Sequence, residues 1–129
     1  MNQILVEVSI GELLDKISIL EIKKKKIKDF EKLKFINDEY NILNDQLNKN
    51  VKSNEKLEKL FQSLKEINAR LWIIEDDKRS CEKNSDFGDK FIKLSREIHF
   101  LNDNRSNIKL EINNHTDSKI KEIKEYTNY

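Results

Sequence analysis

The stretch SIGELLDKISIL, Ser9 to Leu20, decides the fold of this chain. Its first four residues have the form Ser-x-x-Glu, in which the serine oxygen accepts from free N–H groups of a helix and the glutamate reaches back to the cap. Apolar residues then recur at helical spacing, at Ile10, Leu13, Leu14, Ile17, Leu20 and Ile27. The stretch therefore predicts an amphipathic helix that begins at residue 10.

The same apolar stripe continues beyond this stretch, through Phe30, Leu33, Ile36, Tyr40, Leu43 and Leu47. We therefore expect a first helix over residues 10–50, bent or broken near Asp29. The segment NKNVKSNEK then reads as a loop, because it is polar and has no periodicity. Further stripes predict a second helix over 54–83 and a third over 86–113, separated by KNSDFGD. Residues 114–129 form a weakly helical tail or a frayed end.

Ahead of the first helix, Ile4, Val6 and Val8 alternate with polar residues, which predicts a short extended strand over residues 1–8. A lone strand needs a partner. The chain has no proline and only two glycines, so long helices dominate its 129 residues. Short loops between long helices make neighbours antiparallel. The sequence thus predicts one all-α domain, a long antiparallel three-helix bundle or coiled coil with an N-terminal strand.

Composition excludes several classes of function. Lysine and arginine number 25 against 24 acidic residues, so no overall basic field attracts nucleic acid or an anionic membrane. The segment MNQILVEV lacks the cationic region of a signal peptide, and no apolar run is long enough to span a bilayer. The single cysteine, Cys81, excludes an internal disulfide framework. We therefore expect a cytoplasmic protein.

Charged residues fall on the predicted core faces. An ideal helix returns to the same face after about 18 residues, and this step leads from Ile10, Leu57 and Phe87 to Lys28, Glu75 and Arg105. Other polar residues share these faces, namely Glu21, Lys24, Asn68, Arg79, Glu82, Asn102 and Lys109. In a three-helix bundle, Lys28 would lie level with Glu75. Glu21 and Lys24 would lie near Arg79 and Glu82. Arg105 would lie near Asn68.

Such inward charges must pair, reach water or hold a ligand, because burying an unpaired charge costs several kcal/mol. One hypothesis is a binding protein or small enzyme, in which these ten residues hold a small anionic or polyhydroxylated ligand. The alternative is an oligomeric interaction module, joined through the strand or helix faces, whose inward charges fix the register of a coiled coil. No reaction can be assigned.

Other patterns give weaker indications. His99 and His115 lie far apart in the sequence, which argues against a zinc site. The pair Glu12-x-x-Asp15 could be written as a metal-binding motif, but such pairs arise by chance in a chain rich in acidic residues, and Glu12 is already assigned to the cap. Cys81 has no nearby histidine and reads as a structural thiol. We expect no metal and no cofactor.

Three long segments resemble an uncharacterised family of small helical bacterial and viral proteins, a domain of unknown function. They are IGELLDKISILEIK, LWIIEDDKRSCE and FIKLSREIHFLNDNRSNIKLEIN, which lie between Ile10 and Asn113. The departure from the family pattern is Asp77-Lys78, where a less charged pair is expected. The resemblance implies no activity. Because members of the family occur near glycan-assembly enzymes, it implies that any ligand is a sugar or a nucleotide sugar.

Overall fold

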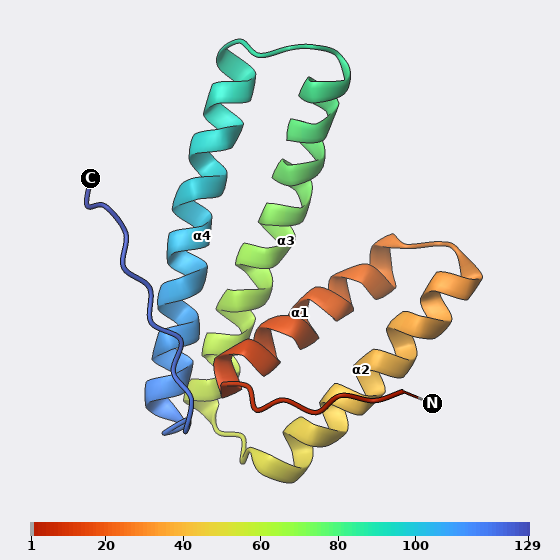
Figure 1. Cartoon of the computed structure of the whole chain (residues 1–129), viewed down its shortest axis with the longest axis vertical. Helices are drawn as coiled ribbons and strands as arrows, with labels where there is room; N and C mark the ends of the chain where they lie inside the picture. The colour runs from red at the N-terminus through yellow and green to blue at the C-terminus, as the bar shows by residue number, and fades with distance from the viewer. Residues whose placement is uncertain (1) are drawn as a thin grey trace.

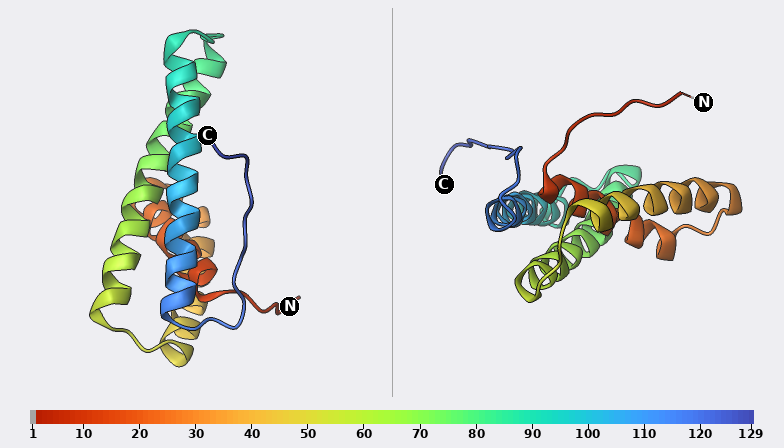
Figure 2. Two further views of the ribbon diagram at one scale, coloured as in Figure 1. Left: turned by 90° about the vertical axis from the view of Figure 1, so that its left-hand side faces the viewer. Right: turned by 90° about the horizontal axis from the view of Figure 1, so that it is seen from below.

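The computed structural model describes residues 2–129, which form an all-helical protein. Its helices are α1 (Ile10–Lys26), α2 (Phe30–Asn50), α3 (Glu55–Lys83) and α4 (Asp89–His115). They form two antiparallel hairpins, α1 with α2 and α3 with α4 (Figure 1). Helix α1 packs against all three other helices, and α3 packs along α4. Seen from below, the α1–α2 hairpin projects sideways from the α3–α4 hairpin (Figure 2).

The predicted three-helix bundle is wrong in its helix count, because the first predicted helix is two helices. Helix α1 ends where Ile27 turns to an extended conformation, with φ −85° and ψ 132°. Asp29 then caps α2, its carboxylate accepting from the Lys32 N–H at 3.0 Å. The chain thus reverses near Asp29, where the sequence allowed a break, and α2 folds back along α1 instead of continuing its direction.

The predicted N-terminal strand is also wrong, since no strand occurs anywhere in residues 2–129. A strand exists only with a hydrogen-bonded neighbour, and the described chain supplies none. Residues 2–8 are instead non-helical and exposed. At the other end the chain leaves α4 after His115, and the non-helical residues 116–129 run back beside α4 (Figure 2).

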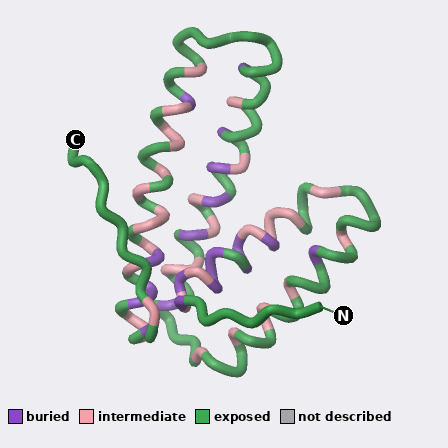
Figure 3. The backbone as a smooth tube through the Cα atoms, viewed as in Figure 1, coloured by how far each residue is buried: buried purple, intermediate pink, exposed green. Residues whose placement is uncertain are grey.

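Two apolar clusters hold the helices together. The proximal one lies where α1 crosses the α3–α4 hairpin and consists of Leu14, Leu57, Leu64 and Ile112. The distal one contains only α3 and α4 residues, namely Ile74, Cys81 and Leu94 with Phe91, Ile98 and Leu101 around them. Buried positions accordingly follow α1 and continue as a sparser stripe along α3 (Figure 3). We call the crossing region the junction and the remainder of the α3–α4 hairpin the distal half.

A glycine allows α1 to approach α4 closely at the junction. A Cβ atom on Gly11 would lie 2.6 Å from the backbone oxygen of Lys109 and 2.9 Å from Oδ1 of Asn113. Real Cβ atoms do not come so near backbone atoms, so any other residue would push the two helices apart. None of the four helices is both long and apolar enough to cross a membrane.

Candidate functional site

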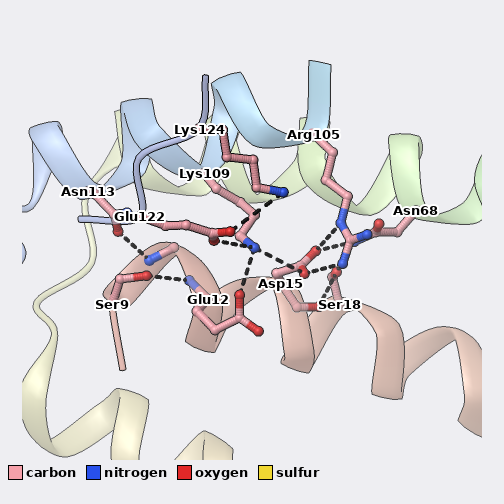
Figure 4. A network of polar contacts seen from close by, with 11 residues as sticks. Ser9, Glu12, Asp15, Ser18, Asn68, Arg105, Lys109, Asn113, Glu122 and Lys124 are labelled. Atoms are coloured by element: carbon pink, nitrogen blue, oxygen red, sulfur yellow. Dashed lines mark hydrogen bonds and ion pairs between the residues drawn. The ribbon is translucent and has the colours of Figure 1, made fainter. Parts of the chain in front are cut away.

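Asp15 is the centre of a polar cluster inside the junction, with only 1% of its surface exposed. Arg105 from α4 donates to both carboxylate oxygens of Asp15, through Nε at 3.0 Å and through Nη2. Asn68 from α3 donates to Asp15 Oδ1 at 2.8 Å and to the Ser18 hydroxyl at 2.7 Å. That hydroxyl donates to the backbone oxygen of Asp15 at 2.7 Å. Three helices are thereby joined through one carboxylate (Figure 4).

Lys109 extends this cluster to the C-terminal tail. Its buried ammonium lies 2.6 Å from Glu12 Oε2, 3.8 Å from Asp15 Oδ2 and 3.2 Å from Glu122 Oε2. Lys124 lies 3.5 Å from the other oxygen of Glu122. Three carboxylates thus face three cations once Lys124 is included, and Figure 4 shows them converging between α1, α4 and the tail. We call the following residues the junction cluster: Glu12, Asp15, Ser18, Asn68, Arg105, Lys109 and Glu122.

The ionisation of these groups follows from their pairing. Burial by itself would raise the pKa of Asp15, but the hydrogen bonds from Arg105 and Asn68, together with the charges of Arg105 and Lys109, outweigh burial and hold that pKa below its ordinary value. Burial opposes the charge of Lys109, yet the hydrogen bond to Glu12 and the charge of Asp15 raise its pKa. The hydrogen bond from Lys109 lowers the pKa of Glu122. Asp15, Lys109 and Glu122 are therefore ionised near neutral pH.

The first N–H groups of α1 are also bonded to side chains from different segments. Ile10 N–H donates to Ser118 Oγ at 3.1 Å, Gly11 N–H to Asn113 Oδ1 at 2.7 Å, and Glu12 N–H to Ser9 Oγ at 3.1 Å. The serine half of the predicted capping box is thus present. The carboxylate of Glu12, however, binds Lys109, so it is directed to α4 and not to the cap.

A second, smaller polar cluster ties α1 to α2 and α3. Lys65 Nζ lies 2.9 Å from one oxygen of Glu21, and the Tyr40 hydroxyl donates to the other at 3.4 Å. Lys24 Nζ lies 4.0 Å from the centre of the Tyr40 ring. Burial, together with the negative charge of Glu21, raises the pKa of Tyr40. The two hairpins are therefore linked by polar contacts at two separate places.

The structure separates the ten residues singled out from the sequence into three groups. Asn68, Arg105 and Lys109 meet in the junction cluster, and Glu21 and Lys24 lie in the second cluster. The remaining five are exposed and belong to neither, namely Lys28, Glu75, Arg79, Glu82 and Asn102. The expected approach of Lys28 to Glu75, and of Glu21 to Arg79, does not occur. Helix α1 ends before the distal half begins, so no third helix covers those faces.

The sequence reasoning missed Asp15, the residue with the most partners. A signal was present, since Gly11, Asp15 and Ser18 recur at spacings of four and three, which puts them on one face of α1 beside Leu14. A row of small or polar residues beside the apolar row of a helix indicates a face that packs against polar neighbours. No comparable signal marks Glu122, because it lies in a non-helical segment.

Within residues 2–129, two open hollows of the surface lie apart from the junction cluster. No group of three or more potential metal ligands among His, Cys, Asp and Glu occurs within residues 2–129. One open hollow of about 520 Å³ lies beside Asn54 and His115. Another, of about 570 Å³, lies beside Arg70 and Phe100. Neither hollow is lined by a residue of the cluster, whose groups bind one another.

Fold and site together define an all-α protein of two crossed helical hairpins joined by an internal charged cluster. The chain belongs to a family of unknown function, DUF6165, whose family model matches residues 4–129. This confirms the resemblance to a domain of unknown function. No curated protein and no solved structure matches the chain significantly.

Proposed function

We propose that this protein is a non-enzymatic, oligomeric interaction module whose junction cluster sets the register in which its two hairpins cross. The proposal rests on one observation: the inward charged groups of the junction cluster bind one another. Asp15 accepts from Arg105 and Asn68, and Lys109 is shared by three carboxylates. Fixing register is the best-attested role of buried polar groups.

A site for a charged ligand needs donors that are available to the ligand. In the junction cluster Arg105 directs two nitrogens at Asp15, and the Lys109 side chain is only 10% exposed. A ligand would have to displace Asp15 or Glu12 from cations that are already paired, and leaving the buried Asp15 carboxylate without a partner is costly. The cluster is therefore better suited to positioning helices than to binding small molecules.

An interaction module must also present a surface to a partner, and this chain leaves large apolar side chains uncovered. Ile4, Leu5 and Val6 are 73–88% exposed, and Phe30 and Phe35 of α2 are 85% and 75% exposed. Covering apolar surface contributes about 25 cal/mol per Å². These side chains favour a protein partner. We place this interaction in the cytoplasm, in keeping with the single buried thiol of Cys81.

A ligand site for a small anionic or sugar-nucleotide molecule is the second candidate, and one observation favours it. Glu122 is the one carboxylate on Lys109 that comes from a non-helical segment, and its side chain is 43% exposed. An external carboxylate or phosphate could take its place beside Lys109 and Lys124. Such an exchange would need the tail to move.

Light scattering on the full chain, measured over a range of protein concentrations, tests the proposal against this second candidate. We expect a particle larger than one chain, and we expect removal of residues 2–8 to leave a monomer with unchanged helical content. A thermal-shift screen against nucleotides, nucleotide sugars and sugar phosphates serves as the counter-test, since a ligand that binds only the folded state raises the melting temperature. A monomer at every concentration, with a ligand shift lost in Arg105→Ala, would reverse the ranking.

A further inference from the structure

The apolar segment of residues 4–8 has a sequence that can pair with itself. Resting on the proposed function, we infer that the partner is a second copy of this chain, and that the two segments pair as antiparallel strands about a twofold axis at Val6. The segment has no backbone hydrogen bond to any other part of residues 2–129. Within residues 2–129, the one ion pair of the segment joins Glu7 to Lys119 at 3.2 Å. Its N–H and C=O groups are thus available to another strand.

The order of side chains in the segment makes one face apolar. Successive residues of a strand point to opposite faces, so Ile4, Val6 and Val8 share one face while Leu5 and Glu7 share the other. Three β-branched residues in five give the segment high strand propensity. The alternation predicted a strand from the sequence, and the missing element is the neighbour that a second copy would provide.

A twofold axis at Val6 matches the two copies completely. Val6 then lies opposite Val6, Ile4 opposite Val8, and Leu5 opposite Glu7. All six β-branched side chains of the pair then lie on one face. Directly opposite side chains on the same face of an antiparallel pair are close enough to stabilise it. Both Glu7 carboxylates lie on the other face. Pairing of identical patches about a twofold axis is the commonest way in which identical chains associate.

Other registers match less well. A shift by one residue moves Glu7 of one copy onto the face of Val6 of the other, so neither face is wholly apolar. An axis at Glu7, or parallel pairing in register, sets two carboxylates side by side, which is destabilising. An axis at Leu5 leaves Val8 opposite the polar Asn2. The axis at Val6 is therefore the register that the side chains favour.

The association should be reversible. A ribbon of two strands is only marginally stable in water, and this pair contains five residues from each copy. We therefore expect a dimer that dissociates on dilution. A lysine at position 6 would set two like charges directly opposite each other at the axis, so Val6→Lys should abolish the dimer.

Disulfide trapping in the full chain tests the register. With Cys81 replaced by alanine, single cysteines are placed at Val6 and at Leu5, which is at least as exposed. Directly opposite residues of an antiparallel pair have Cα atoms about 4.5–5.5 Å apart, within the range that a disulfide spans. We expect the Val6→Cys chain to form disulfide dimers at least ~10-fold faster than the Leu5→Cys chain under the same mild oxidation.

A mixture of Ile4→Cys and Val8→Cys chains should form the mixed disulfide faster than either chain alone forms its own. If the protein is oligomeric by light scattering but Val6→Cys reacts no faster than Leu5→Cys, the inferred register is wrong while the proposed interaction module stands. If all variants are monomeric and react equally slowly, both the second copy as partner and the oligomeric module are excluded.

Discussion

The junction and the distal half both contain the α3–α4 pair, yet polar side chains are buried at the junction and exposed in the distal half. In the distal half Ile74, Cys81 and Leu94 pack together, while the charges of Glu75 and Arg79 point to solvent. At the junction, the same two helices and α1 bury Asn68, Lys109 and Asp15. Inward charge therefore appears where a third helix crosses the pair.

This difference has a physical reason. Two antiparallel helices joined by a short turn are held in register by that turn and by an apolar seam. Helix α1, which is 17 residues long, instead crosses the α3–α4 hairpin, and the loop that follows it leads away to α2. Apolar contacts are not directional, whereas the two-pronged bond of Arg105 to Asp15 fixes distance and angle together. Under the proposed function, the junction cluster therefore sets the crossing of the two hairpins, which apolar packing alone would leave open.

The sharpest contrast between the two regions should come from removing one arginine in each. Arg105→Ala leaves the buried Asp15 carboxylate without its main partner, and breaking a buried pair typically costs about 3–5 kcal/mol. We expect the lower part of that range, because Lys109 remains 3.8 Å from Asp15. Arg79→Ala, the distal control, removes an exposed side chain and should change stability by less than about 0.5 kcal/mol. Urea unfolding followed by circular dichroism measures both; equal effects would erase the contrast.

The two glycines of the chain provide a second matched pair. An added Cβ at Gly11 meets the Lys109 backbone at 2.6 Å, whereas at Gly88, beside the distal turn, the nearest atom is 3.5 Å away. Gly11→Ala should therefore destabilise the protein by about 1–3 kcal/mol through overpacking. Gly88→Ala, at the N-cap of α4, should cost less than about 1 kcal/mol. If both variants unfolded at the same urea concentration as the wild type, the close approach of α1 to α4 at Gly11 would not contribute to stability.

The pH dependence of stability should reflect the junction in a specific direction. The pKa of Asp15 is lower in the folded protein than in the unfolded chain, so its stabilising effect is complete above the unfolded value of about 3.9. That effect is lost as pH falls through the folded pKa. The pKa of Lys109 is raised, so its contribution is complete below about pH 10.4 and is lost as pH rises through the folded value.

Melting temperatures of the wild type and of Asp15→Asn, measured from pH 2 to pH 7, test the acid limb of this dependence. We expect the wild-type advantage over the variant to shrink as pH falls below about 4. A difference that stays constant down to pH 2 would show that Asp15 is not stabilised in its ionised form.

The smallest effect should come from the tail. Glu122 pairs with Lys109, but its side chain is 43% exposed, and ion pairs with such access to water contribute about 0.2–1 kcal/mol. Glu122→Gln should therefore lower stability by no more than that amount. Glu125→Gln, a neighbouring exposed carboxylate, is the control and should unfold like the wild type. A loss above about 2 kcal/mol, outside the range for exposed pairs, would make the tail an integral part of the junction.

Much of the helical content could be predicted from the sequence, because periodic apolar residues and the Ser9 cap are local signals. The count of helices could not, since a reversal at Asp29 without proline or glycine looks the same as a bend. The inward charges were overpredicted for a related reason. Stepping along a stripe assumes a neighbouring helix at every level, and Glu75 and Arg79 have no such neighbour beyond α4. Asp15 was overlooked because its significance depends on Arg105, 90 residues away.

Under the proposed function, the junction cluster fixes the angle and register at which the two hairpins cross. Spin labels at Asn41 on α2 and Lys90 on α4, both exposed, report the distance between the hairpins in a Cys81→Ala background. Replacing the central pair by Asp15→Leu with Arg105→Met keeps similar volume, and such replacements often leave stability unchanged or raise it. The distal changes Glu75→Leu with Arg79→Met provide the matched control.

Pulsed electron paramagnetic resonance of these doubly labelled proteins is the most direct measurement. We expect one narrow distance distribution in the wild type and in the distal control, and a broadened or multiple distribution in the junction variant at equal helical content. A junction variant that keeps the single narrow distance of the wild type would show instead that apolar packing alone sets the crossing, and that the charges at Asp15 and Arg105 serve another purpose.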